Sequence, residues 1–489
     1  MLPRVTSMLF GLSVLLAATT SSAQVFDGQA RELLRKMQQQ PNDLARYVYL
    51  VQAMPDLSAW NKQLAAQYVS FSQCELGIYS QAVLSFPLSI SMPPNLELPR
   101  VDQWRGVPAA QAITAMARDR RLVMINEAHH DAHTRQLTLE LLPRLRALGF
   151  NYFAAEALLA ADSSLSERGY PVQGSGTEYL REPLYGDIVR TALRLGYHVI
   201  AYDAGTPGQG RERQQARNLY RQVFAHDPTA RLFVHAGYAH IDKAPGRLAN
   251  MEPMSMLLKE LSGLESLSID QTEFLEVSLD EADAYHRLVK AFPTTQPEVL
   301  LSRAGGKPWS AQPTLYDVNV ILPPSLSMAA FGEKTSTPAE PDAGSAPSHD
   351  TPDAMPTSMT AIMLRPQLGM ATYGEDSPRG RESSTSAARP HGRSALVTTT
   401  VMQRPAWLSL DGQRHAFPIS TALCKAITPC VVEARYASES DHAITADRYA
   451  FMAGNSSSTL YLRPGSYQLR ASNVFGGTLS AQTLTIPEH

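Results

Sequence analysis

The chain contains few residues of the kinds that mark disulfide-rich, nucleic-acid-binding or membrane-spanning proteins. Its 489 residues include 3 cysteines, and Lys plus Arg (43) do not outnumber Asp plus Glu (46), so the formal net charge is −3. No basic stripe interleaves with aromatic residues, and we therefore expect no nucleic-acid partner. The apolar stretch within residues 8–18 is too short to cross a bilayer, so we expect no transmembrane span in the mature chain.

The first 23 residues are typical of a secretory signal peptide. They hold one arginine, an apolar stretch and the small residues Ser21, Ser22 and Ala23, with the cut expected after Ala23. A membrane anchor is the alternative, and the absence of a cysteine after the apolar stretch argues against a lipoprotein. We predict a periplasmic or secreted protein, in which Cys424 and Cys430 can close a small disulfide loop and Cys74 stays a buried thiol.

The length and the changing patterning predict several domains. After the signal peptide (1–23) we expect a helical N-terminal segment (24–110), which either caps the next part or forms a domain of its own. Residues 111–334 alternate short apolar strands with amphipathic helices. This is the pattern of an α/β fold with a mostly parallel sheet and helices on both faces.

The rest of the chain has a different composition. Residues 335–394 are rich in Pro, Ser, Thr, Ala and Gly, which predicts a disordered linker. Residues 395–489 alternate in period two, which predicts a small antiparallel β-sandwich. We expect this domain to bind a surface, a glycan or a protein partner.

Titratable residues follow the ends of four predicted strands. The strands are RLVMIN, NYFAAE, YHVIAYD and ARLFVHAG, and the residues are Glu127 and His129, Glu156, Asp203, and His235 and His240, respectively. Because parallel strands present their carboxyl ends at one edge of a sheet, where ligands bind, we predict a functional site there. The segments NEAH and GYAH each place a histidine three residues after a small or turn-forming residue, a spacing that lets the chain turn sharply.

Several of these side chains have a structural alternative. Asp203 is a substrate contact or a cap of the next helix, and His235 is a substrate contact or a satisfied histidine of a buried strand. Tyr238 is a substrate contact or a packing residue. His130 and His133 are expected to begin a helix, because the HHDAH run lacks the glutamate of the zincin pattern. The long loop 161–186, which includes Arg181 and Tyr185, is a candidate lid or specificity loop.

The same segments resemble the erythromycin esterase, ChaN-like and Tiki/TraB superfamily over about residues 115–270. The usual first motif of that group is Gly-Glu-x-His, and here Asn126 replaces the glycine while Glu127 and His129 match. Glu156 matches the second glutamate, and HAGYAH matches the last motif through Gly237 and His240. RERQQARNL resembles a helix start that reads Arg-Asp-x-x-Met-Ala-x-Asn. It does so through Arg211, Glu212, Gln215 and Asn218, of which Arg211, Gln215 and Asn218 share one helix face.

The resemblance implies three kinds of function. The erythromycin esterase branch implies a metal-free hydrolase in which His129 activates water, Glu127 or Glu156 orients it, and Arg211 steadies an oxyanion or an anionic substrate group. The Tiki-like branch implies a metal-dependent peptidase whose Glu127, His129, Glu156 and His240 bind Mn, Co, Fe or Zn. The ChaN-like branch implies haem or iron binding without catalysis.

We expect an exported hydrolase that acts on a small-molecule or peptide substrate. The expected catalytic residues are Glu127, His129, Glu156, Arg211, Glu212 and His240, and the expected substrate contacts are Asp203, His235 and Tyr238.

Overall fold

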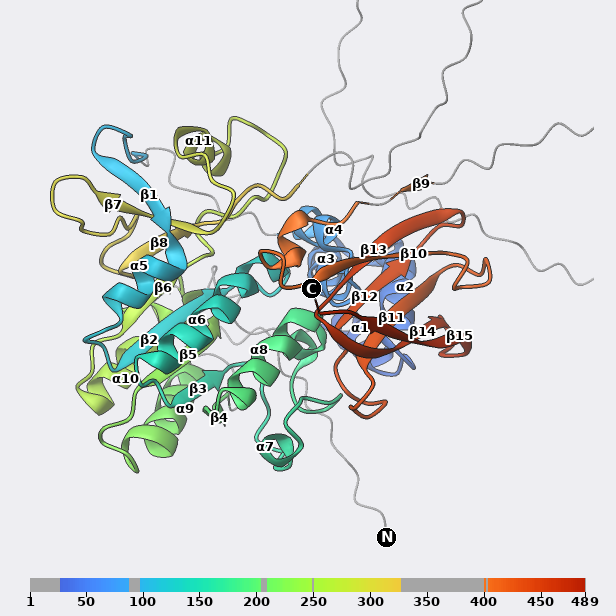
Figure 1. Ribbon diagram of the computed structural model, residues 1–489, viewed down its shortest axis with the longest axis horizontal. Coiled ribbons are helices and arrows are strands. Elements are labelled where there is room, and N and C mark those ends of the chain that lie inside the picture. Colours follow the sequence, from blue (N-terminus) through green and yellow to red (C-terminus); the bar gives the residue numbers. More distant parts are fainter. Residues whose placement is uncertain are drawn as a thin grey trace, which may run out of the picture.

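The computed structural model describes residues 27–87, 97–203, 209–248, 250–326, 400–401 and 403–488. The predicted signal peptide (1–23) and linker (335–394) lie outside these residues. The described chain forms three parts, which are an N-terminal group of helices, a central α/β part and a C-terminal β part (Figure 1). The N-terminal helices are α1 (Gly28–Gln38), α2 (Asp43–Ala53), α3 (Ala59–Glu75) and α4 (Tyr79–Ser85).

An eight-stranded sheet forms the centre of the α/β part, in the order β1-β7-β8-β6-β2-β5-β3-β4. The strands are β1 (Trp104–Pro108), β2 (Leu122–Glu127), β3 (Tyr152–Ala155), β4 (His198–Ala201), β5 (Leu232–Gly237), β6 (Leu267–Asp270), β7 (Glu298–Ser302) and β8 (Val318–Ile321). The pairs of β2 with β5 and β6, of β3 with β4 and β5, and of β6 with β8 are parallel. The expected mostly parallel α/β fold is confirmed, and the antiparallel β1–β7 and β7–β8 pairs add an edge to it.

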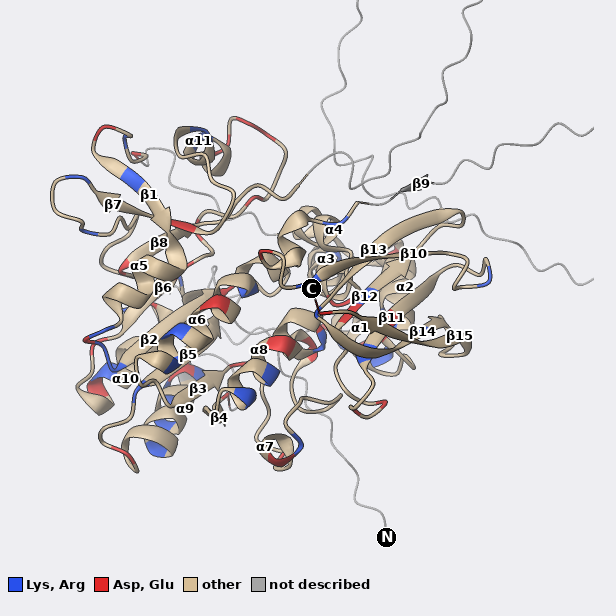
Figure 2. Cartoon of the chain, viewed as in Figure 1, with Lys and Arg blue, Asp and Glu red and all other residues tan. Residues whose placement is uncertain are grey.

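The strands are buried on both faces because their apolar side chains alternate between two helical layers. Val123 and Ile125 of β2 pack with α5 (Ala109–Met116), α6 (Gln136–Ala147) and α8 (Pro183–Arg194). Leu122 and Met124 pack on the other side with α9 (Gln209–Leu219) and α10 (Met254–Ser262). Figure 2 shows Lys/Arg and Asp/Glu interspersed over the described chain, with neither sign gathered on one element.

The C-terminal part is a small β-sandwich. One sheet has the order β10-β13-β9 and the other β12-β11-β14-β15. The strands are β9 (Thr400–Val401), β10 (His415–Ser420), β11 (Cys430–Tyr436), β12 (Asp447–Phe451), β13 (Ser456–Leu462), β14 (Gly465–Asn473) and β15 (Thr478–Ile486). The pairing is antiparallel as expected, except that the short β9 runs parallel to β13. Cys424 and Cys430 are bonded, and Cys74 is a buried free thiol.

The β-sandwich packs directly against the other two parts. One hydrophobic cluster contains Leu33 of α1, Leu184 of α8 and Val431 of β11 together. Buried ion pairs join the same parts, since Arg448 contacts Asp43 at 2.7 Å and Arg190 contacts Glu439 at 2.6 Å. The helical segment therefore caps the α/β part together with the sandwich. Among the described residues, no helix is long and apolar enough to span a membrane.

Candidate functional site

The predicted site residues meet at the carboxyl-terminal edge of the sheet. Glu127 is the last residue of β2 and lies in register with Gly237, the last residue of β5. Glu156 follows β3 directly, and its backbone N–H donates to the carbonyl of His235 at 3.1 Å. Because four parallel strands end here, residues more than a hundred positions apart become neighbours.

The first half of the site is a carboxylate–imidazole pair. Nδ1 of His129 lies 2.9 Å from Oε1 of Glu127. Burial alone would raise the pKa of Glu127, but the Arg135 guanidinium, the hydrogen bond from His129 and the nearby ring of His235 hold it well below its usual range. The side chain is thus a carboxylate that only accepts, so in the neutral form of the His129 imidazole Nδ1 carries the proton and Nε2 the lone pair.

The second half of the site is centred on Arg211, the first predicted residue of the α9 face. Its Nη2 contacts Oε1 of Glu156 at 2.5 Å and Oδ2 of Asp203 at 2.8 Å, while its Nε contacts Oδ1 of Asp203 at 3.0 Å. Burial would lower the pKa of Arg211, but these two carboxylates raise it, so the guanidinium stays charged. Gln215 also donates to Asp203, at 3.0 Å, and Asn218 donates to the Tyr202 carbonyl at 2.8 Å, so the predicted helix face points to the end of β4.

His240 lies between two carboxylates. Its Nδ1 is 2.9 Å from Glu212 Oε2, and its Nε2 is 3.4 Å from Glu156 Oε1. Burial would lower the pKa of His240, but Glu212 and Glu156 raise it to about 10. At neutral pH His240 is therefore an imidazolium, which has no free lone pair with which to accept a proton.

Gly237 is the point where the two halves approach each other. Its backbone N–H donates to Oε2 of Glu156. A Cβ at this position would lie 2.6 Å from Nε2 of His129 and 3.0 Å from Oε2 of Glu156. The turn expected at this glycine is made by the next residue, because Gly237 has φ −76° whereas Tyr238 has φ 43°. Glycine is needed here for space, not for a left-handed backbone.

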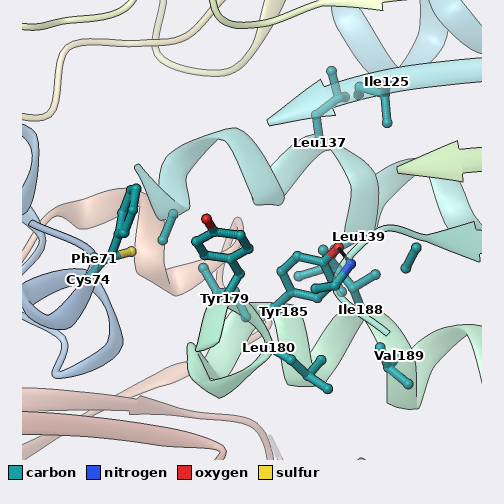
Figure 3. Packing of buried hydrophobic residues seen from close by; sticks show 14 of the residues in the cluster. Phe71, Cys74, Ile125, Leu137, Leu139, Tyr179, Leu180, Tyr185, Ile188 and Val189 are labelled. Atoms are coloured by element: carbon teal, nitrogen blue, oxygen red, sulfur yellow. Dashed lines mark hydrogen bonds between the residues drawn. The ribbon is translucent and has the colours of Figure 1, made fainter. Parts of the chain in front are cut away.

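Aromatic side chains cover the imidazole of His129. The ring of Tyr179 stacks on it at 3.8 Å, and Tyr238 and Phe71 approach it edge-on at 5.1 and 6.3 Å. Tyr179 comes from the loop that we expected to be a lid, and Figure 3 shows it between Phe71 of α3 and Tyr185 of α8. As a result His129 is 8% exposed.

The remaining predicted residues have structural partners. His235 is fully buried, with Nδ1 3.0 Å from Thr138 Oγ1 and Nε2 3.8 Å from Glu127 Oε2. His130 and His133 stack on Phe86 and Trp407 at 3.7 and 4.7 Å, and burial lowers the pKa of each to about 3. His133 lies in the short 3-10 segment Ala132–Arg135, so only this histidine fits the expected helix start.

Other predicted contacts point away from His129 or do not reach it. Arg181 pairs with Asp43 at 3.0 Å, and the hydroxyl of Tyr185 accepts from the Ala157 N–H at 3.3 Å. Asn126 donates to the Tyr238 carbonyl at 2.8 Å and to Asp270 at 2.7 Å. It thereby holds the backbone that carries the unusual φ of Tyr238.

Three residues at the site were not predicted from the sequence. Arg135 contacts Glu127 at 2.5 Å, Glu182 contacts Arg135 at 3.0 Å, and Tyr179 covers His129. Arg135 and Glu182 belong to no motif, although an Arg eight residues after Glu127 and a Glu before Pro183 are visible in the sequence.

The four candidate metal ligands do not form a metal site. Both oxygens of Glu127 are taken by His129 and Arg135, and Arg211 lies 2.5 Å from Glu156 and 3.5 Å from Nε2 of His240. The guanidinium therefore puts a positive charge where a divalent ion would need its ligands. Over the described residues, no group of three or more His, Cys, Asp or Glu is arranged to hold a metal.

No protein-family model and no curated protein matches the chain. The solved structures that resemble it include the type III effector HopBA1, with a TM-score of 0.25, 15% identity and coverage of 36% of this chain and 87% of that one. Another, described as bacterial protein toxins, has a TM-score of 0.26, 12% identity and coverage of 51% and 68%. Likenesses at these TM-scores carry no argument about fold or function.

Proposed function

We propose that the chain is a hydrolase of the erythromycin esterase type, in which His129 activates a water molecule to cleave an ester or amide bond without a metal. The observation that supports this most is the contact of Nδ1 of His129 with the Glu127 carboxylate at 2.9 Å. It leaves Nε2 as the proton acceptor and stabilises the imidazolium that forms after proton transfer.

The positive charges of Arg211 and His240 could stabilise the negative oxygen that forms when the activated water attacks the substrate. Nε2 of His129 lies beside Gly237, whose N–H donates to Glu156, and the Arg211 guanidinium and the His240 imidazolium contact the other carboxylate oxygen of Glu156. Fixed cations of this kind stabilise the negative oxygen that develops when water attacks a carbonyl carbon. His240 keeps its charge at neutral pH because its pKa is raised to about 10 by Glu212 and Glu156.

Access to His129 requires Tyr179 to move, because its ring covers the imidazole. The loop that carries Tyr179 then acts as the lid over the reaction. We propose further that the protein acts after export, in the periplasm or outside the cell. The predicted binding of a surface, glycan or protein partner by the β-sandwich stays a prediction.

Turnover of p-nitrophenyl acetate and butyrate tests the proposal. His129→Gln should lower kcat by about 10²–10⁴-fold, the usual contribution of a general base. His198→Gln is the matched control, because this histidine lies exposed at the start of β4. Dialysis against a chelator should leave the rate unchanged. Equal rates for the parent and His129→Gln, or a rate restored only by added Mn²⁺ or Zn²⁺, would contradict the metal-free mechanism.

A further inference from the structure

A buried cation lies directly behind the Glu127–His129 pair. Arg135 is fully buried, and its Nε contacts Oε2 of Glu127 at 2.5 Å while its Nη2 lies 3.3 Å from the carbonyl of His129. One guanidinium thus contacts both members of the pair, the carboxylate of one and the backbone of the other. Because its donors point in fixed directions within a plane, it fixes the direction of the Glu127 carboxylate as well as its charge.

Glu182 holds Arg135 from the far side. Its Oε2 accepts from Arg135 Nη1 and from the Tyr185 N–H, each at 3.0 Å. Its Oε1 accepts from the Leu184 N–H at 3.0 Å and from the Tyr79 hydroxyl at 2.8 Å. Glu182 therefore joins the amino-terminal end of α8 and helix α4 to the cation behind Glu127.

The contacts continue into the β-sandwich. The Arg404 guanidinium lies 5.2 Å from the ring centre of Tyr79. The ring centre of Trp407 lies 5.5 Å from the same Tyr79 ring centre. Trp407 also stacks on His133, which lies two residues before Arg135. Cys74 of α3 lies 3.7 Å from Arg135 Nη1, and Figure 3 shows this thiol near Phe71. All three parts of the chain thus surround Arg135.

We propose that Arg135 and Glu182 are positioning residues, which hold the Glu127 carboxylate so that His129 presents Nε2 to the reacting water. A buried ion pair is a costly way to stabilise a fold, because apolar residues of similar volume serve as well. Holding a reacting group in one orientation is a task that such a pair performs and apolar packing does not. The inference rests on the proposed function, since water activation by His129 is the activity that it supports.

The test compares kcat and KM for p-nitrophenyl butyrate in the full chain, with His129→Gln as the reference for lost base catalysis. Arg135→Met should lower kcat by about 100-fold, the effect of misplacing a reacting group by about 1 Å, and should leave KM unchanged. Arg135→Lys should recover part of the loss, because it keeps the charge. Glu182→Gln and Tyr79→Phe change the side-chain shape little but weaken the contacts that hold Arg135 against Glu127. Each should lower kcat by about tenfold.

Arg190→Met is the matched control, because it breaks another buried Arg–Glu pair, 2.6 Å long, away from His129. It should lose stability but keep kcat per folded molecule. Parental kcat in Arg135→Met and Glu182→Gln, with His129→Gln inactive, would overturn the positioning role and leave the proposed function intact. The positioning role would also be overturned if the loss of activity in Arg135→Met is explained by its smaller folded fraction and is equal to the loss in Arg190→Met. If His129→Gln itself keeps the parental rate, the proposed function has failed instead.

Discussion

The change Gly237→Ala adds a single methyl group at the narrowest point of the site. That carbon would lie 2.5 Å from Cε1 and 2.6 Å from Nε2 of His129. Ordinary contacts between such atoms are about 3.5–4.0 Å, so His129 or the end of β5 must shift by about 1 Å. The backbone itself accepts alanine, since φ −76° and ψ 138° are ordinary extended values.

His129 has little room to give way, because Tyr179 stacks on one face and Glu127 holds Nδ1. We therefore expect a loss of about 1–3 kcal/mol in the free energy of unfolding, the usual cost of overpacking. A shift of about 1 Å should also lower the rate by about 100-fold.

Urea unfolding followed by circular dichroism measures the first effect, and p-nitrophenyl ester turnover measures the second. Gly246→Ala is the matched control, because its added methyl would meet Leu315 at 3.4 Å, which is near an ordinary contact. If Gly237→Ala is as stable as the parent, the placement of His129 against the end of β5 is wrong. If it is destabilised but fully active, Nε2 does not need this position.

Three further predictions concern the buried charges of His240 and Asp43 and the aromatic ring that covers His129. The folded-state pKa of His240 is raised to about 10 from an ordinary value of 6.5, so its stabilising charge is fully present below about pH 6.5 and is lost as the pH rises through about 10. The urea midpoint of unfolding should fall between about pH 6.5 and pH 10, and His240→Gln should remove much of this fall. An identical fall in the variant would mean that His240 is not the group responsible. Arg448→Met removes one of the three arginines that pair with Asp43, since Arg46 and Arg181 remain at 2.7 and 3.0 Å. It should cost about 1.5–3 kcal/mol in urea unfolding, the contribution of a hydrogen bond to a charged group, whereas Arg463→Met, whose half-buried guanidinium lies 3.7 Å from Asp187, should cost much less. Tyr179→Ala should increase the rate at which diethyl pyrocarbonate modifies His129 severalfold, as measured by peptide mass spectrometry; unchanged reactivity would mean that Tyr179 does not shield it.

The site was predictable where topology alone brings residues together. In a parallel sheet every strand that ends in a polar residue delivers it to the same edge, so Glu127, Glu156, Asp203 and His240 were identified from strand ends. Arg211, Gln215 and Asn218 were identified from helical spacing, and their common face does point to the end of β4.

Contacts that depend on tertiary packing could not be predicted, because they leave no recognisable pattern in the local sequence. Tyr179 lies in the short 3-10 segment Glu178–Arg181 of the long loop, and only the packing of that segment against α3 brings its ring onto His129. The role of Asn126 likewise depends on Asp270, which lies far along the chain. The β-sandwich was expected from its alternation, but its docking rests on pairs such as Arg448 with Asp43, for which sequence patterning gives no signal.

The docked β-sandwich also bears on how the protein can be divided. Asp43, Arg190 and Tyr79 each lie outside the sandwich, and each loses a partner if residues 400–488 are removed. A fragment that ends before β9 would therefore expose apolar surface and remove one partner each from the buried charges of Asp43 and Arg190. We therefore expect that the pieces between the boundaries suggested by composition are not stable on their own. We expect the N-terminal helices, the α/β part and the sandwich to unfold together in one cooperative transition.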